Sequence, residues 1–233
     1  MTPPSSDSGT FLSAGYTLST HTGRTDCTGI RLRPLTLAND HTQRVFLPST
    51  WAVEWCKESP EERLARAADF GIDPSRLEDL IQRVTAGFES EFGAWHTILD
   101  LEVARELWRD YARAEGVRLW GVGLAHDELE AMHEEMEPNH AMGAGWALLR
   151  AQTMAPGGRL LGYEVLVDGI GCFNSLESLH HPEDELYQAA GVAPGPNGLF
   201  EEHEPARALA RLARERFGQN WRAWRIQQYE LTE

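Results

Sequence analysis

The chain is poor in basic residues, and above all in lysine. Lysine and arginine together number 21 among 233 residues, against 36 aspartates and glutamates, and Lys57 is the only lysine. The formal net charge is therefore -15 at pH 7. Binding to a nucleic-acid backbone depends on clustered lysine and arginine that displace counterions from phosphate, so this composition argues against a nucleic-acid-binding protein.

Long apolar runs and a secretory leader are also lacking. No stretch approaches the roughly 18 consecutive apolar residues of a membrane-spanning helix, so we expect no contact with a membrane. The chain starts with MTPPSSDSGT, which has neither the basic start nor the apolar centre of a secretory signal peptide. We therefore predict a cytoplasmic protein.

Cysteine is scarce, and the usual glycine motifs of nucleotide-binding proteins are missing. Cys27, Cys56 and Cys172 lie far apart and are odd in number, which fits neither a disulfide framework nor a zinc knuckle. The chain contains no GxxxxGK[ST] motif, and the glycines at 169 and 171 lack the third glycine of a dinucleotide-binding turn. We expect no cofactor.

The acidic residues are distributed unevenly. The 47 residues from 160 to 206 contain no lysine or arginine. Such a stretch repels anions and attracts basic proteins or cations, although it also occurs as a solvated surface that only aids solubility. The candidate partner-binding residues in it are Glu183, Asp184, Glu185, Glu201 and Glu202.

The pattern of helix and turn signals predicts a chain in three parts. Residues 1–28, rich in Ser, Thr, Gly and Pro, are expected to form a flexible tail with one marginal strand over 11–18. Residues 29–116 are expected to be mainly helical, because Ser59-Pro60-Glu61-Glu62 and Asp73-Pro74 are strong helix starts. Residues 117–233 are expected to mix strands and helices, unless the whole of 29–233 is one compact domain.

The second half of the chain supplies the strands of the predicted fold. Apolar and β-branched runs predict strands over 117–124 and 160–167, and a final strand over 222–231 with one phase slip. Helices are predicted over 127–137, 183–190 and 204–217. The predicted fold class is α+β, with a mostly helical N-terminal half and a C-terminal half in which a small sheet packs with helices.

Two groups of residues are candidates for a site of chemistry. His126, Glu130 and His133 share one face of a predicted helix, but about 10 Å of helix rise separates the two histidines, too far to hold one ion. Cys172 lies near His181 in sequence, but a buried cysteine that packs as a small apolar side chain is the commoner case. We therefore predict no metal site and no catalytic residue.

Eight tryptophans are a further unusual feature of the composition. Most are expected in the core, since each buries a large apolar area. Trp221 and Trp224 fall on opposite faces of the predicted last strand, so one of them is expected to be exposed. An exposed tryptophan on an acidic surface would suit a protein partner, because aromatic residues dominate binding hot spots.

Residues 160–231 resemble a loose set of small bacterial proteins. The shared pattern appears here as Leu161-Gly162-Tyr163-Glu164, Phe173-Asn174-Ser175, Asn197-Gly198-Leu199, the helix over 204–217, and Trp224. Asn174 stands where the pattern has histidine, so no chemistry is transferred from that position. Some proteins of this type resemble immunity proteins, which bind and block a secreted toxin in the producing cell.

These observations lead to one expected function and one alternative. The expected function is a non-enzymatic, cytoplasmic binding protein of immunity type that holds a basic protein partner on an acidic face. The alternative is a hydrolase or metal-dependent enzyme with a site between the two halves. Its residues would be drawn from His126, His133, His140, Cys172 and His181. The oligomeric state is left open.

Overall fold

A computed structural model describes most of the chain. The described residues are 10–21, 43–53, 58–93, 97–135, 144–168, 173–176 and 179–232. In chain order the elements are β1 (Phe11–His21), β2 (Gln43–Val45), α1 (Pro48–Trp51), α2 (Pro60–Asp69), the 3-10 helix η1 (Pro74–Arg76), α3 (Leu77–Gly87), β3 (Phe92–Gly93), β4 (Thr97–Ile98), α4 (Leu101–Asp110), β5 (Arg118–Ala125), α5 (His126–Glu135), α6 (Ala144–Leu148), β6 (Arg159–Asp168), β7 (Phe173–Ser175), α7 (Glu183–Ala190), α8 (His203–Phe217) and β8 (Trp221–Tyr229).

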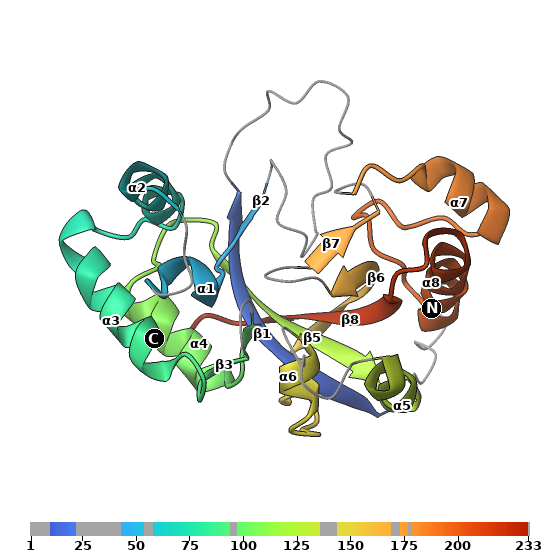
Figure 1. Cartoon of the computed structure of the whole chain (residues 1–233), viewed down its shortest axis with the longest axis horizontal. Helices are drawn as coiled ribbons and strands as arrows, with labels where there is room; N and C mark the ends of the chain where they lie inside the picture. Colours follow the sequence, from blue (N-terminus) through green and yellow to red (C-terminus); the bar gives the residue numbers. More distant parts are fainter. Residues whose placement is uncertain are drawn as a thin grey trace.

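The strands form one curled antiparallel sheet with helices at both sides (Figure 1). The strand order is β3-β4-β1-β5-β8-β6-β7, and β2 also pairs with β1. Helices α1–α4 lie at the β1 side of the sheet, whereas α7 and α8 lie at the β6 side. The mixed α+β class predicted from the sequence is confirmed.

The expectation of a mostly helical N-terminal half is wrong, because strands begin at residue 11. The marginal strand expected over 11–18 is the full strand β1, which pairs with β5 over eight residue pairs from Phe11↔Ala125 to Ser19↔Arg118. Hydrogen bonds of the sheet thus pair a strand that precedes residue 117 in the sequence with a strand that follows it. Of the tail predicted over 1–28, Phe11–His21 form the largely buried strand β1, and residues 1–9 and 22–28 lie outside the described residues.

Burial of these small polar residues is possible because neighbouring groups satisfy them. Ser19 is buried and its hydroxyl accepts a hydrogen bond from the Trp120 indole at 2.5 Å. At Gly15 the chain has a φ of +102°, and a side chain there would collide with Thr97. A break in the β1–β5 register lies at the same place, between Ser13 and Gly15. Glycine therefore allows this bulge to lie against β4.

The predicted helix starts are confirmed at α2 and at η1. Ser59 and Glu62 form a complete capping box: Ser59 Oγ accepts from the Glu62 amide at 3.2 Å, and Glu62 Oε2 accepts from the Ser59 amide at 2.7 Å. Asp73 caps the short η1 turn that leads into α3. No helix in the described ranges has the length and apolar character needed to span a membrane.

Both faces of the sheet are covered, and β8 shows this most clearly. Trp221 and Ala223 pack with α8, and Tyr229, on the same face of the strand, packs with the apolar residues of α1–α4. Trp224 and Ile226 point to the opposite face, where they meet Trp120. Residues of α5 and α6, Met132 and Leu148, cover that second face.

Candidate functional site

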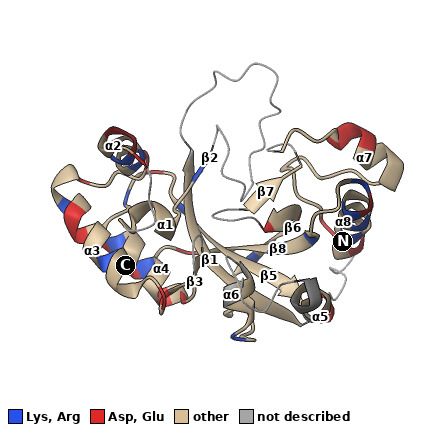
Figure 2. Cartoon of the chain, viewed as in Figure 1, with Lys and Arg blue, Asp and Glu red and all other residues tan. Residues whose placement is uncertain are grey.

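The acidic residues expected to bind a partner are at the surface of α7 and α8. Glu183, Asp184 and Glu185 form the first turn of α7, whereas Glu201 and Glu202 come directly before α8. All except the half-buried Glu183 are exposed. Figure 2 shows the acidic start of α7 and the acidic and basic residues of α8 on this side of the molecule.

These five residues form two groups at opposite ends of α7. Just before α7, His181 stacks on Phe217, the last residue of α8, at 3.7 Å between ring centroids. Farther along α7, Tyr187 contacts Phe200, which lies just before α8. The α7 acids are therefore near the end of α8, and Glu201 and Glu202 are at its start. Arg211, exposed on α8, lies between the two helix ends.

The acids at the start of α7 also have a structural role. Pro182 is the N-cap residue, and it has no side chain that could accept a hydrogen bond from the first turn. Three carboxylates in that turn complement the partial positive charge of the helix start, each typically contributing a few tenths of a kcal/mol. Glu201 and Glu202 precede α8, and no side-chain capping bond involves Glu202.

Arg207 of α8 gathers a third set of carboxylates. Its guanidinium donates to Asp127 at 3.0 Å, to Glu128 at 3.1 Å and to Glu204 at 3.4 Å. Asp127 and Glu128 belong to the first turn of α5, so this arginine links the starts of α5 and α8. The one positive charge of Arg207 therefore offsets part of the charge of these three carboxylates.

Glu128 is the buried member of this set. Burial raises the pKa of its carboxyl above the usual range, although Arg207, Arg222 and Arg214 act in the opposite direction. Its Oε2 has no hydrogen-bond partner in the described part of the chain. Glu164, which the sequence placed among the acids of the 160–206 stretch, is also buried because it lies inside β6. It adds nothing to the acidic surface.

The residues weighed for chemistry are not brought together by the described structure. His126 is exposed at the start of α5, whereas His181 is a packing residue that contacts Phe217 and Trp221. The side chains of Glu130 and His133, and the whole of His140 and Cys172, lie outside the described residues. Among the side chains that the structure describes, no group of three His, Cys, Asp or Glu could hold a metal ion.

The expectation that one of the last two tryptophans is exposed is wrong. Trp221 and Trp224 are both fully buried, because helices or other strands cover each face of β8. Trp224 donates its indole hydrogen to the Leu166 carbonyl at 3.1 Å. These two side chains are parts of the core and are not available to a partner.

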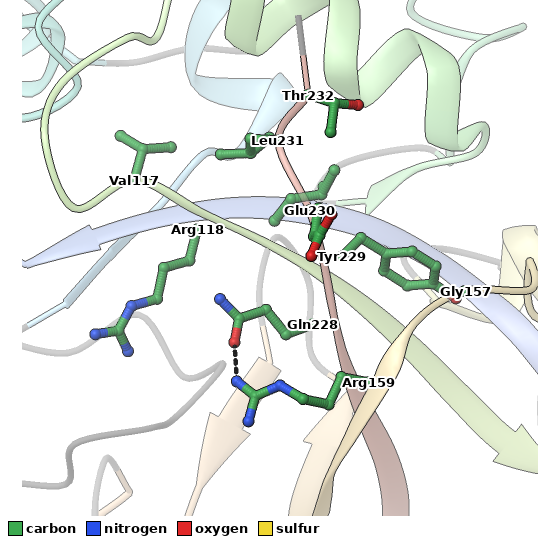
Figure 3. A pocket seen from close by; sticks show the side chains of 10 residues that line it. Val117, Arg118, Gly157, Arg159, Gln228, Tyr229, Glu230, Leu231 and Thr232 are labelled. Atoms are coloured by element: carbon green, nitrogen blue, oxygen red, sulfur yellow. Dashed lines mark hydrogen bonds between the residues drawn. The ribbon is translucent and has the colours of Figure 1, made fainter.

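A groove that the sequence gave no sign of lies where β5 and β6 begin and β8 ends. We call it the sheet-end groove; it has a volume of about 500 Å³. Its lining residues are Val117, Arg118, Leu119, Gly157, Arg159, Gln228, Tyr229, Glu230, Leu231 and Thr232. Figure 3 shows the guanidinium groups of Arg118 and Arg159 directed to the same side, with the Gln228 amide between them.

A second pocket, of about 370 Å³, lies against α2, and we call it the α2 pocket. It is lined by Arg44, Glu58, Glu62, Ala65, Arg66 and Asp69. Here each arginine has an acidic partner: Arg66 lies 2.5 Å from Glu58, and Arg44 lies 3.5 Å from Asp69.

Comparison with known proteins gives no relative from which a function could be transferred. No protein-family model matches the chain, and neither the curated proteins nor the solved structures include a significant match. The function must therefore be argued from the residues themselves.

Proposed function

We propose that this is a non-enzymatic binding protein that holds a basic protein partner through the acidic residues of α7 and of the segment before α8. The supporting observation is that Glu185, Glu201 and Glu202 are exposed and form no ion pair with any residue that the structure describes. Asp127 and Glu204, by contrast, are paired with Arg207.

Exposed carboxylates of this kind act mainly on the rate and selectivity of association. They attract a basic partner over a distance set by the ionic strength and repel acidic proteins. Most of the affinity of an interface comes from a few apolar or aromatic side chains that become buried on binding. Tyr187, half-buried on α7 between the two acidic groups, is an aromatic side chain in a suitable place.

The resemblance of residues 160–231 to immunity-type proteins agrees with this proposal, since such proteins neutralise a toxin by binding it. Most of the quoted pattern lies in β6, α8 and β8. The acidic segments lie next to α8 in the sequence and in the fold. As part of the same proposal, we place the protein in the cytoplasm of a bacterial cell, where an immunity protein meets its partner.

The proposal can be tested by reversing the charge of one acidic group at a time. Tagged wild-type protein and the variant Glu201→Lys/Glu202→Lys would be used to capture proteins from the source cells at low salt. We expect a basic protein that binds the wild type and is lost from the variant. Its purified form would then bind the wild type at least about tenfold more tightly than the variant in calorimetry.

A matched control separates the local effect from a change in net charge. The variant Glu61→Lys/Glu89→Lys reverses two exposed acids in α2 and after α3, far from α7 in the sequence. It should keep the partner. If the control loses the partner to the same extent, or if Glu201→Lys/Glu202→Lys keeps it, the proposal is wrong.

A further inference from the structure

We propose that the sheet-end groove is a binding site for a small multivalent oxyanion, such as a phosphate ester or a polycarboxylate. This site is separate from the acidic surface of α7 and α8, and the two proposals do not depend on each other. The groove lies at the opposite end of β8 from Trp221, the residue that follows α8 and packs with it.

The groove is built on adjacent strands. Gln228 of β8 pairs with Trp120 of β5 on one side and with Arg159 of β6 on the other. Directly paired residues point to the same face of a sheet, and so do residues two apart on one strand. Arg118, two residues before Trp120, therefore lies on the same face as Gln228 and Arg159 and diagonally across from Gln228, and Figure 3 shows the three side chains near one another. A site on regular strands is held more rigidly than one on loops.

The polar groups of Arg118, Gln228 and Arg159 are mostly hydrogen-bond donors. Arg159 donates to Gln228 Oε1 at 2.6 Å, which fixes the arginine and turns the donor nitrogen of the amide away from it. A guanidinium has five N–H donors, so this bond leaves most of them available. Arg118 forms no hydrogen bond or ion pair with the residues that the structure describes. Two planar donor forks beside an amide suit a ligand with several oxygen atoms.

The turn beside the groove packs closely against β8. A side chain at Gly158 would come within 2.6 Å of the Tyr229 ring, so the turn before β6 can lie close to β8 only because it has glycine there. Tyr229 is itself fixed, since its hydroxyl donates to the Ala155 carbonyl at 2.7 Å. Burial raises the pKa of the phenol, in keeping with its packing against the apolar residues of α1–α4.

Size and charge narrow the class of ligand. A volume of about 500 Å³ is in the range of pockets that hold small molecules. Glu230 is the one carboxylate among the lining residues, so the described groove has a net charge of +1 from two arginines and one glutamate. Because the whole chain has a net charge of -15, a ligand with a single negative charge would be attracted only weakly by a groove of charge +1. Bidentate bonds to several oxygens would be needed.

The test uses two probes that represent the two sources of such an oxyanion. Pyrophosphate and citrate would be titrated separately into the full-length protein by calorimetry at low ionic strength. We expect one or both to bind with one-to-one stoichiometry. Binding of pyrophosphate alone assigns the phosphate class, and binding of citrate alone assigns the carboxylate class. If neither binds at millimolar concentration, the proposal is overturned.

Variants connect the binding to this groove. Arg118→Gln and Arg159→Gln should each weaken it roughly tenfold, the usual effect of losing a charge-assisted contact. Glu230→Gln should strengthen it, a gain that misfolding cannot produce. Arg44→Gln, in the α2 pocket, should leave it unchanged. Binding that persists in the double variant Arg118→Gln/Arg159→Gln would overturn the proposal. The arginine Nε–H NMR signals of the wild type provide a direct readout, because those of Arg118 and Arg159 should shift on titration.

Discussion

The α2 pocket and the sheet-end groove are both lined by two arginines, but only the first neutralises them. In the α2 pocket Arg66 pairs with Glu58 and Arg44 with Asp69. In the sheet-end groove no ion pair joins Arg118 or Arg159 to a residue that the structure describes, although Glu230 lines the same groove. The difference teaches that an arginine's neighbours, and not its presence, decide whether a pocket can accept an anion.

The two pockets also differ in how they are built. Most of the α2 pocket comes from one stretch of chain, residues 58–69, in which acids and arginines alternate along a helix. The groove takes its residues from the starts of β5 and β6 and the end of β8, which are distant in sequence. A helix can supply counter-ions for its own arginines within one or two turns, whereas strands meet whatever their partners present.

The largest expected effect concerns Gly158, which lies between the groove-lining residues Gly157 and Arg159. Gly158→Val should destabilise the protein by about 2 kcal/mol, because the new side chain must displace the packed Tyr229 ring. Chemical denaturation measures this change in the free energy of unfolding. The matched variant in the other pocket is Ala65→Leu, at an exposed helical position, which should change stability little. Equal losses in the two variants would mean that the groove is not rigid.

The next effect concerns the cap that starts α2. Ser59→Ala should cost about 1 kcal/mol at neutral pH, the usual value of an N-cap. Hydrogen bonds from the Ser59 backbone and side chain lower the pKa of Glu62. A lowered pKa in the folded state adds stability above the unfolded value, and this contribution is lost as the pH falls through the folded value.

The difference between wild type and Ser59→Ala should therefore shrink as the pH falls below 4.5, the ordinary value for Glu62. Thermal unfolding over a pH series gives this difference directly. Arg118→Gln, in the groove, should show no such acid dependence relative to wild type. A constant difference for Ser59→Ala across the acid range would show that the Ser59 hydroxyl does not contribute to the lowered pKa of Glu62, since the backbone bond from residue 59 remains in the variant.

A smaller effect on stability is expected from replacing one arginine of each pocket. Arg66→Gln should lower the free energy of unfolding by about 0.5 kcal/mol, because it removes a partly exposed ion pair with Glu58. Arg118→Gln should cause no loss, since it breaks no ion pair within the described structure. Urea denaturation of both variants under the same conditions tests the contrast, which fails if Arg118→Gln is the more destabilising change.

The smallest effect is expected when the α2 pocket is altered so that its arginines lack acidic partners, as in the sheet-end groove. Glu58→Gln/Asp69→Asn removes the acidic partners of Arg66 and Arg44 and leaves Glu62 in place. We expect a second, weaker pyrophosphate event in calorimetry, in addition to that of the groove. An unchanged isotherm would show that unpaired arginines alone do not bind pyrophosphate, and that the arrangement of donors in the sheet-end groove is also required.

Local sequence patterns predicted those elements whose signals lie within one turn or one strand. The helix start at Ser59, the strand β6 and the helix α8 were all found in this way, since each depends on neighbouring residues. The final strand was also found, but its apparent phase slip was misinterpreted. Trp224 and Ile226 face one side and Tyr229 the other, and both sides are apolar because both are covered.

The sequence-based predictions failed where polar residues, which are usually exposed, are buried in the fold. The small polar residues of β1 indicated a tail, yet Ser13, Thr17 and Ser19 are buried within the sheet. Glu164 is an acid of the stretch 160–206 that composition alone would place at the surface, but it is buried inside β6. Sequence alone does not reveal which strand lies in the middle of a sheet, because that depends on pairing with β5, more than 100 residues away.

The sequence by itself determined the charge balance, the starts of α2 and η1, the positions of α7 and α8, the mixed class of the fold and the exposed acids beside α7 and α8. These depend on residue type and on interactions over a few positions. Only the tertiary structure decided that the last tryptophans are core residues, that Arg207 pairs with three acids, and that Arg118, Gln228 and Arg159 lie near one another on one face of the sheet. Each of these results from the pairing of distant segments, and the physical reason is that the register of the strands sets which side chains meet.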